Sequence, residues 1–228
     1  MAITTAEAAR LLQISTREVR RLIATGDLQA EAVGRIFLLD EASVHARQRS
    51  PVRRGRALAT GTAWAVLLEA SGERAGWLDR PTRSRIKSWL RRHAPEEISA
   101  ACRKRAVRHD LRVLPAYLDA VILSEGVVPG GMTAAGSTDA DIVTFGEAPR
   151  EFYCTGEALT HLRQAYHLST AGEPNLIARV PLFDNPQVLA RDVMPVAVIA
   201  VDLLESADVR TRRAGGDLLR TAMDRNIS

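Results

Sequence analysis

Cysteine is scarce in this 228-residue chain: Cys102 and Cys154 are the only two, and they have no metal-type spacing. A disulfide framework is therefore not expected, and a reducing compartment is the natural setting. No apolar run approaches the about 18 residues that a membrane-spanning helix needs, and the opening residues lack the basic and apolar regions of a secretory signal. These absences predict a cytoplasmic protein without a membrane partner.

Residue patterns typical of catalysis or cofactor binding are also few. The five histidines show no three- or four-residue pairing, which argues against a helical metal site. The glycine-rich stretch Gly126–Gly131 lacks the lysine of a phosphate-binding loop. Asp139 and Asp141 adjoin a Gly-Ser pair too closely for a nucleotidyltransferase-type site. We therefore predict no catalytic residue, no metal and no cofactor; the alternative is a nucleic-acid-modifying enzyme with a metal at these two aspartates.

Lysine is rare as well, and the charge is unevenly distributed along the chain. Only Lys87 and Lys104 among the 31 basic residues are lysines. Residues 1–113 hold 22 Arg and Lys against 12 Asp and Glu, a net charge of +10, whereas residues 114–228 hold 9 Arg against 15 acids, a net charge of −6. A basic front half suits a polyanion such as nucleic acid, and an acidic back half does not. The chain is long enough for two domains.

Two short amphipathic helices are predicted near the amino terminus. Thr4 and Glu7 have the spacing of a capping box at the start of the first helix, and Ser15 and Glu18 repeat it at the start of the second. Gly26 follows the second helix, as expected of a C-terminal cap. The apolar stripe of this second helix consists of Val19, Leu22 and Ile23.

A tight turn between two such helices is typical of the helix-turn-helix unit. In that unit the amino-terminal part of the second helix enters the DNA major groove. Arginine there bonds guanine, and a hydroxyl side chain contacts a base or a phosphate. The predicted DNA-binding residues of this helix are Ser15, Thr16, Arg17, Arg20 and Arg21.

Two β-capable runs around Gly34 and Arg35 predict a hairpin after the second helix. The segment TTAEAARLLQISTREVRRLIATGDLQAEAVGRIFLLDEASV resembles the MerR/excisionase-type winged helix-turn-helix. The resemblance implies that residues 1–48 form a DNA-binding domain and that Arg35 on the wing contacts the DNA backbone. Gln13 stands where relatives carry a turn glycine, and Glu31 places an acid in the wing. Because one such motif reads a short site, we expect at least a homodimer on a two-fold operator.

The middle of the chain is basic and helical. Residues 49–56 predict a basic linker in which Arg53 and Arg54 run along DNA phosphates. A helical segment is predicted over 57–105, with helices at 57–70, 81–93 and 95–104, and Asp79 is placed to cap the second of these. The three tryptophans of this segment are expected to be core anchors.

Residues 106–228 alternate β and α patterns irregularly, which predicts an acidic mixed α/β domain that binds a partner. The chain is therefore predicted to be of α+β class, with an N-terminal winged helix-turn-helix, a helical middle and a C-terminal mixed α/β domain. Strands are expected at 106–113, 121–124, 141–145, 151–154 and 176–181, and helices at 115–120, 155–168, 195–204 and 209–225.

Several runs in this half, RVLPAYL, LSEG, ADIV, EFYC and VAVIAVDLLESADVRTRRAG, are similar to an antitoxin family paired with nucleotidyltransferase toxins of the abortive-infection E type. The resemblance implies a transcriptional autoregulator that binds double-stranded operator DNA and neutralises a nucleotidyltransferase-type toxin through its C-terminal domain. An acidic half would suit a basic partner that handles nucleic acid. The alternative is a ligand-responsive regulator without a toxin, whose pocket is bordered by the glycine-rich 126–136 loop.

Overall fold

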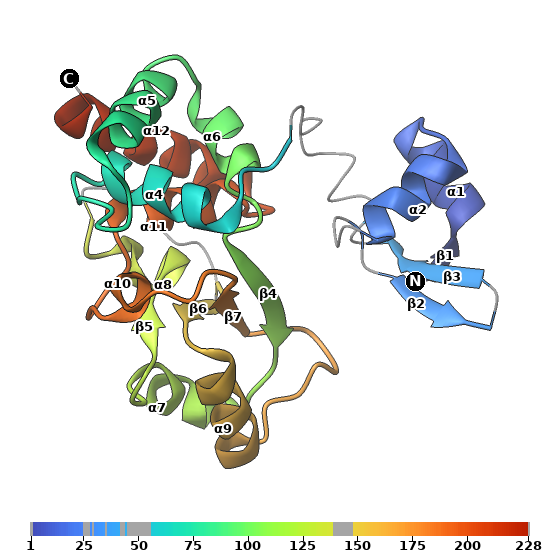
Figure 1. Cartoon of the computed structure of the whole chain (residues 1–228). Coiled ribbons are helices and arrows are strands. Elements are labelled where there is room, and N and C mark those ends of the chain that lie inside the picture. Colours follow the sequence, from blue (N-terminus) through green and yellow to red (C-terminus); the bar gives the residue numbers. More distant parts are fainter. Residues whose placement is uncertain are drawn as a thin grey trace. The chain divides into compact units, whose positions relative to one another are not determined.

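The chain folds as an α+β protein of two compact units, residues 1–53 and 54–228, each described here by itself (Figure 1). The computed structural model describes residues 2–24, 28, 30–34, 36–41, 44, 56–138 and 148–227. The division between the units falls within the predicted linker 49–56, and that linker lies outside the described residues except for Arg56. The expected strand at 141–145 lies outside them too.

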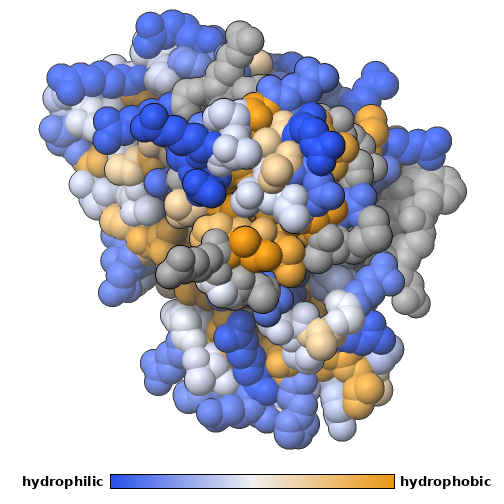
Figure 2. Space-filling model, turned by 90° about the vertical axis from the view of Figure 1, so that its right-hand side faces the viewer, coloured by the Kyte–Doolittle hydropathy of each residue, from blue (hydrophilic) through white to orange (hydrophobic). Residues whose placement is uncertain are grey.

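On the face that Figure 2 shows, hydrophilic side chains lie mainly toward the edges, and apolar side chains are exposed near the centre and in smaller groups elsewhere. Among the described residues, none of the helices has the length and apolar character needed to cross a bilayer.

Unit 1 combines two helices with a three-stranded sheet. Its elements are β1 (Ala2–Thr4), α1 (Thr5–Leu12), α2 (Thr16–Ala24), β2 (Ala30–Val33) and β3 (Ile36–Asp40). Both strand pairs are antiparallel, in the order β1-β3-β2, and Gly34 has a positive φ of 63° at the β2–β3 turn. The hairpin and both helices were expected from the sequence; β1 was not.

The turn between α1 and α2 is a Schellman-type helix end. Gln13 adopts a left-handed conformation with φ 53° and ψ 42°, and its N–H donates to the carbonyl of Arg10. The N–H of Ile14 donates to the carbonyl of Ala9 at 3.1 Å, which completes the pattern. A glycine is the usual residue here, so Gln13 holds a conformation that an L side chain disfavours.

The two helices of unit 1 pack on its sheet through a small apolar core. Thr4 and Glu7 form the predicted capping box of α1, since each side chain accepts the other's backbone N–H. The fully buried side chains of α2 lie on one face of that helix. The buried core consists of Ile3, Ala8, Ala9, Val19, Leu22, Leu28, Leu39 and Val44.

Unit 2 is built on a mixed four-stranded sheet. Its strands are β4 (Ala106–Leu111), β5 (Val128–Pro129), β6 (Arg150–Tyr153) and β7 (Leu176–Pro181), in the order β4-β7-β6-β5. The β6–β7 pair is parallel, and the other two pairs are antiparallel. The helical elements are α4 (Thr60–Ala70), α5 (Arg80–Leu90), α6 (Pro95–Ala101), η1 (Pro115–Tyr117), α7 (Leu118–Ile122), α8 (Gly131–Ala135), α9 (Gly156–Tyr166), α10 (Pro186–Leu189), α11 (Val196–Leu204) and α12 (Val209–Asn226).

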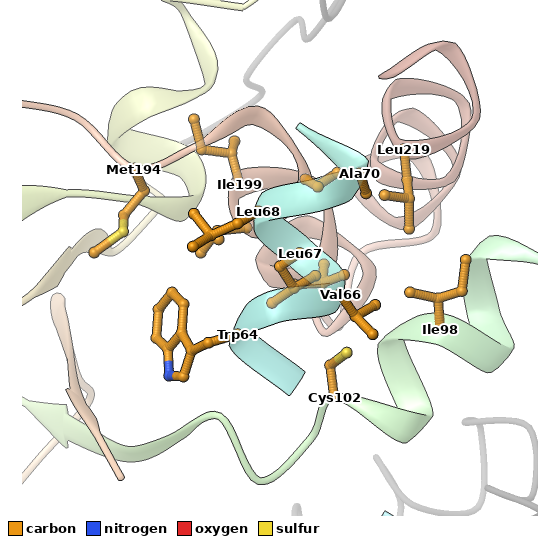
Figure 3. Close-up of a cluster of buried hydrophobic side chains, with 14 of the residues drawn as sticks. Trp64, Val66, Leu67, Leu68, Ala70, Ile98, Cys102, Met194, Ile199 and Leu219 are labelled. Atoms are coloured by element: carbon orange, nitrogen blue, oxygen red, sulfur yellow. The ribbon is translucent and has the colours of Figure 1, made fainter. Parts of the chain in front are cut away.

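Helices cover the sheet in two groups. In Figure 1, α4, α5, α6, α11 and α12 gather at one end of unit 2, and α7 and α9 lie at the other. The larger core centres on α4 and α11, which are apolar nearly all round and therefore buried. Trp64 points into this core, near Leu68 and Met194 (Figure 3). The core joins residues of 57–105 to residues of 106–228, so the predicted helical segment and C-terminal domain are parts of one unit.

Two of the predicted helix starts in unit 2 have side-chain caps at the expected residues. Asp79 accepts the N–H of Thr82 at 2.8 Å, and Thr155 accepts the N–H of Ala158 at 3.1 Å. The strand predicted at 121–124 is wrong: α7 covers Leu118–Ile122. A short apolar run reads equally as strand or helix, and here Val121 is buried in the second, smaller core on the α7 and α9 side of the sheet.

Candidate functional site

The predicted DNA-binding residues of α2 lie together on one exposed surface. The Ser15 hydroxyl caps the helix by accepting the N–H of Glu18 at 3.1 Å. Val19 and Leu22 face the core of unit 1, and the polar residues of the first two turns therefore face outward. The exposed residues are Ser15, Thr16, Arg17, Arg20 and Arg21.

The three arginines of α2 differ in the hydrogen bonds and ion pairs that their guanidinium groups form. Arg21 donates to both carboxylate oxygens of Glu18, at 2.9 Å from Nε and 2.6 Å from Nη2. Among the described residues, Arg17 and Arg20 have no ion-pair or hydrogen-bond partner for their guanidinium groups. An exposed ion pair is worth little, about 0–1 kcal/mol, so Arg21 can exchange Glu18 for a phosphate at small cost.

A shallow hollow of about 500 Å³ lies beside the start of α2. The hollow is lined by residues of α1 and of the turn, among them Arg10, Gln13 and Ile14, and by Ser15 and Thr16 at the start of α2. The N–H groups of the first turn of a helix attract anions. The arrangement places a cation, a hydroxyl-bearing cap and a helix start around one depression.

The β2–β3 hairpin presents a different chemistry. Glu31 is exposed on β2, and on β3 Ile36 and Phe37 retain 58% and 36% exposure. Arg35, predicted to contact the DNA backbone, lies outside the described residues, as do Arg53 and Arg54. The described part of the hairpin is therefore apolar and acidic at its surface.

A second cationic surface lies in unit 2. The sequence from Arg80 to Arg92 contains six basic residues and no carboxylate. Arg85 is exposed on α5, while Arg91 donates to the carbonyl of Ile227 at 2.8 Å, which ties the end of α5 to the end of α12. Such a surface attracts polyanions without reading sequence. Sequence reasoning placed these residues outward but did not assign them to a site.

An acidic and apolar surface occupies the opposite end of unit 2, on α7 and α9 (Figure 1). Between Arg112 and Arg150 the sequence has no lysine or arginine, and the described carboxylates of this stretch are Asp119 and Glu125. Asp119 Oδ1 lies 3.5 Å from Nη2 of Arg150. Large apolar side chains are exposed there: Leu114 at 68%, Tyr117 at 45% and Leu123 at 83%. A hollow of about 380 Å³ adjoins this surface, between residues 124–126 and α9.

Sequence reasoning missed a group of buried polar and charged side chains where α11 meets the sheet. Its members come from β6, β7, α11 and the residue that precedes β4. Since they lie far apart in sequence, no motif spacing marks them. This buried charge cluster consists of Arg105, Glu151, Tyr153, Arg179, Asp202 and Glu205.

Asp202 is the central acceptor of the buried charge cluster. Its Oδ1 lies 2.5 Å from Nη2 of Arg105 and accepts the Tyr153 hydroxyl at 2.8 Å. The N–H of Gly131 donates to Oδ2 at 3.2 Å, and Nε of Arg179 lies 3.3 Å from Oδ1. The side chain of Asp202 is fully buried, so one carboxylate ties α11 to the sheet and to the first residue of α8.

Glu205 bridges the two arginines of the cluster. Its two oxygens lie 2.8 Å from Nη1 of Arg105 and 2.8 Å from Nη1 of Arg179. Glu151 lies 3.3 Å from Nη2 of Arg179, and burial raises the pKa of Glu151 above its ordinary value of 4.5, although Arg179 opposes that shift. The side chains of these residues are at most 13% exposed, so the cluster connects structural elements and is closed to a substrate.

Two glycines of the 126–131 stretch, Gly130 and Gly131, lie against this cluster. A side chain at Gly130 would collide with Tyr153, and one at Gly131 would collide with Glu151. The side chains of Tyr153, Glu151 and Asp202 therefore fill the space beside these two glycines. The absence of side chains at Gly130 and Gly131 allows the backbone to pack closely against the buried charge cluster.

The described residues provide little for redox or metal chemistry. Burial raises the pKa of the Cys102 and Cys154 thiols to about 12, which keeps both in the unreactive thiol form. No group of three or more His, Cys, Asp or Glu within the described ranges is arranged to hold a metal. Asp139 and Asp141, the metal ligands of the alternative enzyme hypothesis, lie outside those ranges. Comparisons with known protein families, curated proteins and solved structures found no match to this chain.

Proposed function

We propose that the chain is a DNA-binding transcriptional autoregulator and that unit 1 acts as a winged helix-turn-helix. One observation carries the proposal: the start of α2 exposes Ser15, Thr16, Arg17 and Arg20 together, on a helix whose opposite face is buried. In a helix-turn-helix the N-terminal residues of the second helix contact base edges, and arginine is a common partner of guanine there.

In the proposed complex α2 lies in the major groove with its first two turns against base edges. Arg17 and Arg20 are the candidates for guanine, because their guanidinium groups are not engaged by other described residues. Ser15 and Thr16 lie at the helix start, where a phosphate is favoured. A homodimer would place two such helices on the halves of a two-fold operator.

Fluorescence anisotropy with duplex DNA from upstream of the chain's own gene tests this proposal. Arg17→Ala and Arg20→Ala should each weaken binding by about 1–3 kcal/mol if they read bases. Binding to a random duplex should weaken much less. The matched control is Arg213→Ala, which removes an exposed arginine from α12 in unit 2.

The binding results distinguish three interpretations of the role of α2. Equal losses on operator and random DNA would mean that the two arginines contact phosphates only. Unchanged binding by both variants would reject α2 as the reading helix. Absence of any binding by the wild-type chain, at low salt where phosphate contacts are strongest, would reject the function itself.

The second half of the proposal is that unit 2 binds and neutralises a nucleotidyltransferase-type toxin, as an antitoxin does. The acidic and apolar surface of α7 and α9 supports it, since protein interfaces combine apolar anchors with charges complementary to the partner. Leu123, at 83% exposure, is the most exposed of the described large apolar side chains. Asp119 and Glu125 lie near Leu123 in sequence, and Asp119 is paired with Arg150 at 3.5 Å.

Co-expression with the product of a neighbouring nucleotidyltransferase-type gene tests this half. The full chain should co-purify with that protein in a fixed ratio, and Leu123→Asp should weaken the complex without changing DNA binding. Val209→Asp, which alters another exposed apolar residue of unit 2, is the control. No complex with the wild-type chain would contradict the antitoxin function and leave the DNA-binding function untouched.

A ligand-responsive regulator without a toxin is the second candidate function. The hollow of about 380 Å³ between residues 124–126 and α9 favours it. Polar groups of Ser124, His161 and Tyr166 line this hollow together with Leu162. A metabolite that raises the melting temperature of the chain and changes its operator affinity would support this candidate over the antitoxin.

A further inference from the structure

The two edges of the unit 2 sheet differ in how they are closed (Figure 1). At one edge, β5 is only two residues long, and the carbonyl of its Pro129 accepts the N–H of Met194 at 3.0 Å. A short strand, a proline and a covering segment are the usual means by which an edge avoids pairing with another strand. At the other edge, β4 has six residues without proline and is paired with β7 along its whole length without a bulge.

Backbone groups alternate in direction along β4. The carbonyls of Arg105 and Leu111 accept the N–H groups of the residues on either side of β7, at 3.0 Å in both cases. Neighbouring residues of an antiparallel strand turn their backbone groups to opposite sides. The odd-numbered residues of β4 therefore face β7, and the even-numbered residues direct their N–H and C=O groups to the open side.

One position on the open side is already paired. Arg112 exchanges two backbone hydrogen bonds with Ser169, at 2.7 and 3.0 Å, just beyond the end of β4. Within the described part of the chain, no residue engages the outward backbone groups of Ala106 and Arg108. A row of such donors and acceptors is a template for one more strand. We call residues 106–108 the open edge.

The side chains of β4 favour a second copy of this chain as the added strand. Val107 is 40% exposed on the open edge, and it would pack against its own counterpart. Lys104 is exposed just before β4, and Asp110, which pairs with Arg108 of its own strand at 2.8 Å, lies near its end. Antiparallel pairing brings the start of one strand to the end of the other, so opposite charges approach across the contact. Two identical antiparallel strands also have the two-fold axis of most dimers.

The register of such a pair follows from the contacts that β4 already makes. A pair centred on His109 would set the partner's Ala106 against Arg112, whose backbone groups are engaged. A pair centred on Arg108 would oppose two guanidinium groups, and like charges directly opposite are unfavourable. A pair centred on Val107 avoids both conflicts, because Arg108 then lies opposite the partner's Ala106.

We propose that two copies of the chain associate by antiparallel pairing of their β4 strands about Val107, which joins two four-stranded sheets into one. About four backbone hydrogen bonds form, between Ala106 and Arg108 of each copy and the same residues of the other. The inference deepens the proposed function, on which it rests for the expectation of a homodimer, by assigning the interface. The dimer supplies the two-fold symmetry that a two-fold operator requires.

Sedimentation equilibrium of the full chain without DNA tests the interface. The wild type should have twice the 24.9 kDa mass of one chain at micromolar concentration. Arg108→Pro deletes an N–H that points away from β7, and proline is tolerated at such edge positions. Because a two-fold contact loses this bond twice, the dimer Kd should rise by about tenfold or more. Arg108→Ala, the matched control, keeps the N–H and should dimerise as the wild type does.

A disulfide reports the register. In the Val107→Cys variant the two cysteines would face each other with their Cα atoms about 4.5 Å apart, the distance of a non-hydrogen-bonded pair, and a disulfide can span it. Oxidised glutathione should therefore give a covalent dimer. Val209→Cys, at another exposed valine of unit 2, should give none. The native Cys102 and Cys154 are buried and do not compete.

Contrary results overturn the proposal in recognisable ways. A monomeric wild type would do so, as would an Arg108→Pro chain that dimerises like the wild type. Equal weakening by Arg108→Ala would make the contact one of the side chain, and a dimer in which Val107→Cys forms no disulfide would place it at another surface.

A folding defect and a failure of the proposed function are both distinguishable from these outcomes. If melting shows that Arg108→Pro is unfolded, Val107→Lys replaces it, since lysine is common on open edges and would here oppose its own charge at the two-fold axis. The Val107→Lys chain should then be monomeric, and a dimer would count against the interface. None of these measurements involves DNA, so a chain that binds no operator would still give a clear result.

Discussion

The fold of unit 2 should depend strongly on Asp202, and Asp202→Asn is the sharpest perturbation of it. The substitution keeps the size of the side chain and removes its charge. Arg105 and Arg179 then lose a carboxylate oxygen at 2.5 Å and 3.3 Å respectively, and the amide must place its NH₂ group against one of the present donors. Glu205 remains as the shared acceptor of both guanidinium groups.

The magnitude follows from the burial of these charges. Breaking a buried ion pair by removal of one partner costs about 3–5 kcal/mol when the other charge is left buried without compensation. Because Glu205 still pairs with both arginines, this range is an upper bound for Asp202→Asn. For a unit of this size each kcal/mol lowers the melting temperature by about 2–4 °C, so the corresponding upper bound on the fall is roughly 6–20 °C. That loss is a large part of the about 5–15 kcal/mol by which a domain is usually stable.

Tryptophan fluorescence during thermal or urea unfolding is the appropriate assay. All three tryptophans, Trp64, Trp77 and Trp89, belong to unit 2, so their emission reports this unit alone. DNA binding at low temperature is the internal control, since unit 1 has its own core. The matched variant is Asp217→Asn, which neutralises an exposed aspartate paired with Arg220 on α12 and should cost little.

A double variant separates the charge from the packing. Arg105→Met combined with Asp202→Leu removes a cation and an anion together and should recover part of the stability that either single change loses. If Asp202→Asn melts within about 2 °C of the wild type, the buried charge cluster does not hold α11 on the sheet, since a 3–5 kcal/mol loss would exceed that shift several-fold.

Two further predictions concern the helix end in unit 1 and the pH dependence of unit 2. Gln13→Gly should stabilise unit 1 by up to about 1 kcal/mol, because glycine adopts the left-handed conformation without strain; slower hydrogen exchange of the α1 and α2 amides would show this, and faster exchange would contradict it. Burial raises the pKa of Glu151 in the folded state, so the folded chain holds its proton more tightly than the unfolded chain. The associated stability is complete below the ordinary value of 4.5 and is lost as pH rises through the raised pKa. Glu151→Gln should therefore flatten the rise in urea sensitivity from pH 4.5 to neutral, and a profile parallel to that of the wild type would contradict the shift.

The helix caps and exposed residues of unit 1 could be predicted from the sequence because they depend on residues a few positions apart. The Thr4–Glu7 capping box and the Ser15 cap each join residues three positions apart, and the structure has both. The exposure of Arg17 and Arg20 follows from the same helical period that buries Val19 and Leu22. Pairing of Arg21 with Glu18 was not foreseen, although the three-residue spacing of opposite charges on a helix indicates it.

For unit 2 the sequence predicts the longer helices and strands but does not predict the buried charge cluster. The bounds of β7 and α11 agree closely with the sequence pattern, since each is an apolar run interrupted by a single charged residue, Arg179 in β7 and Asp202 in α11. The short elements β5 and α8 were missed because two to five residues carry no period. The buried charge cluster was missed for a different reason: Arg105 and Asp202 are 97 residues apart, and only the β4-β7-β6-β5 order brings them together.

The charge bias along the sequence acquires another meaning once the units are known. Residues 1–53 carry 8 basic and 6 acidic residues and residues 54–228 carry 23 and 21, so each unit has a net charge of +2. The excess of positive charge lies mainly in residues 54–112, with 14 basic against 6 acidic residues, and the excess of negative charge lies in the rest of unit 2. Net charge therefore does not favour unit 1 over unit 2 for the proposed DNA binding. What favours unit 1 is the exposed position of Arg17 and Arg20 on α2. Within unit 2, the charge distribution separates a cationic surface on α5 from an acidic, apolar surface on α7 and α9.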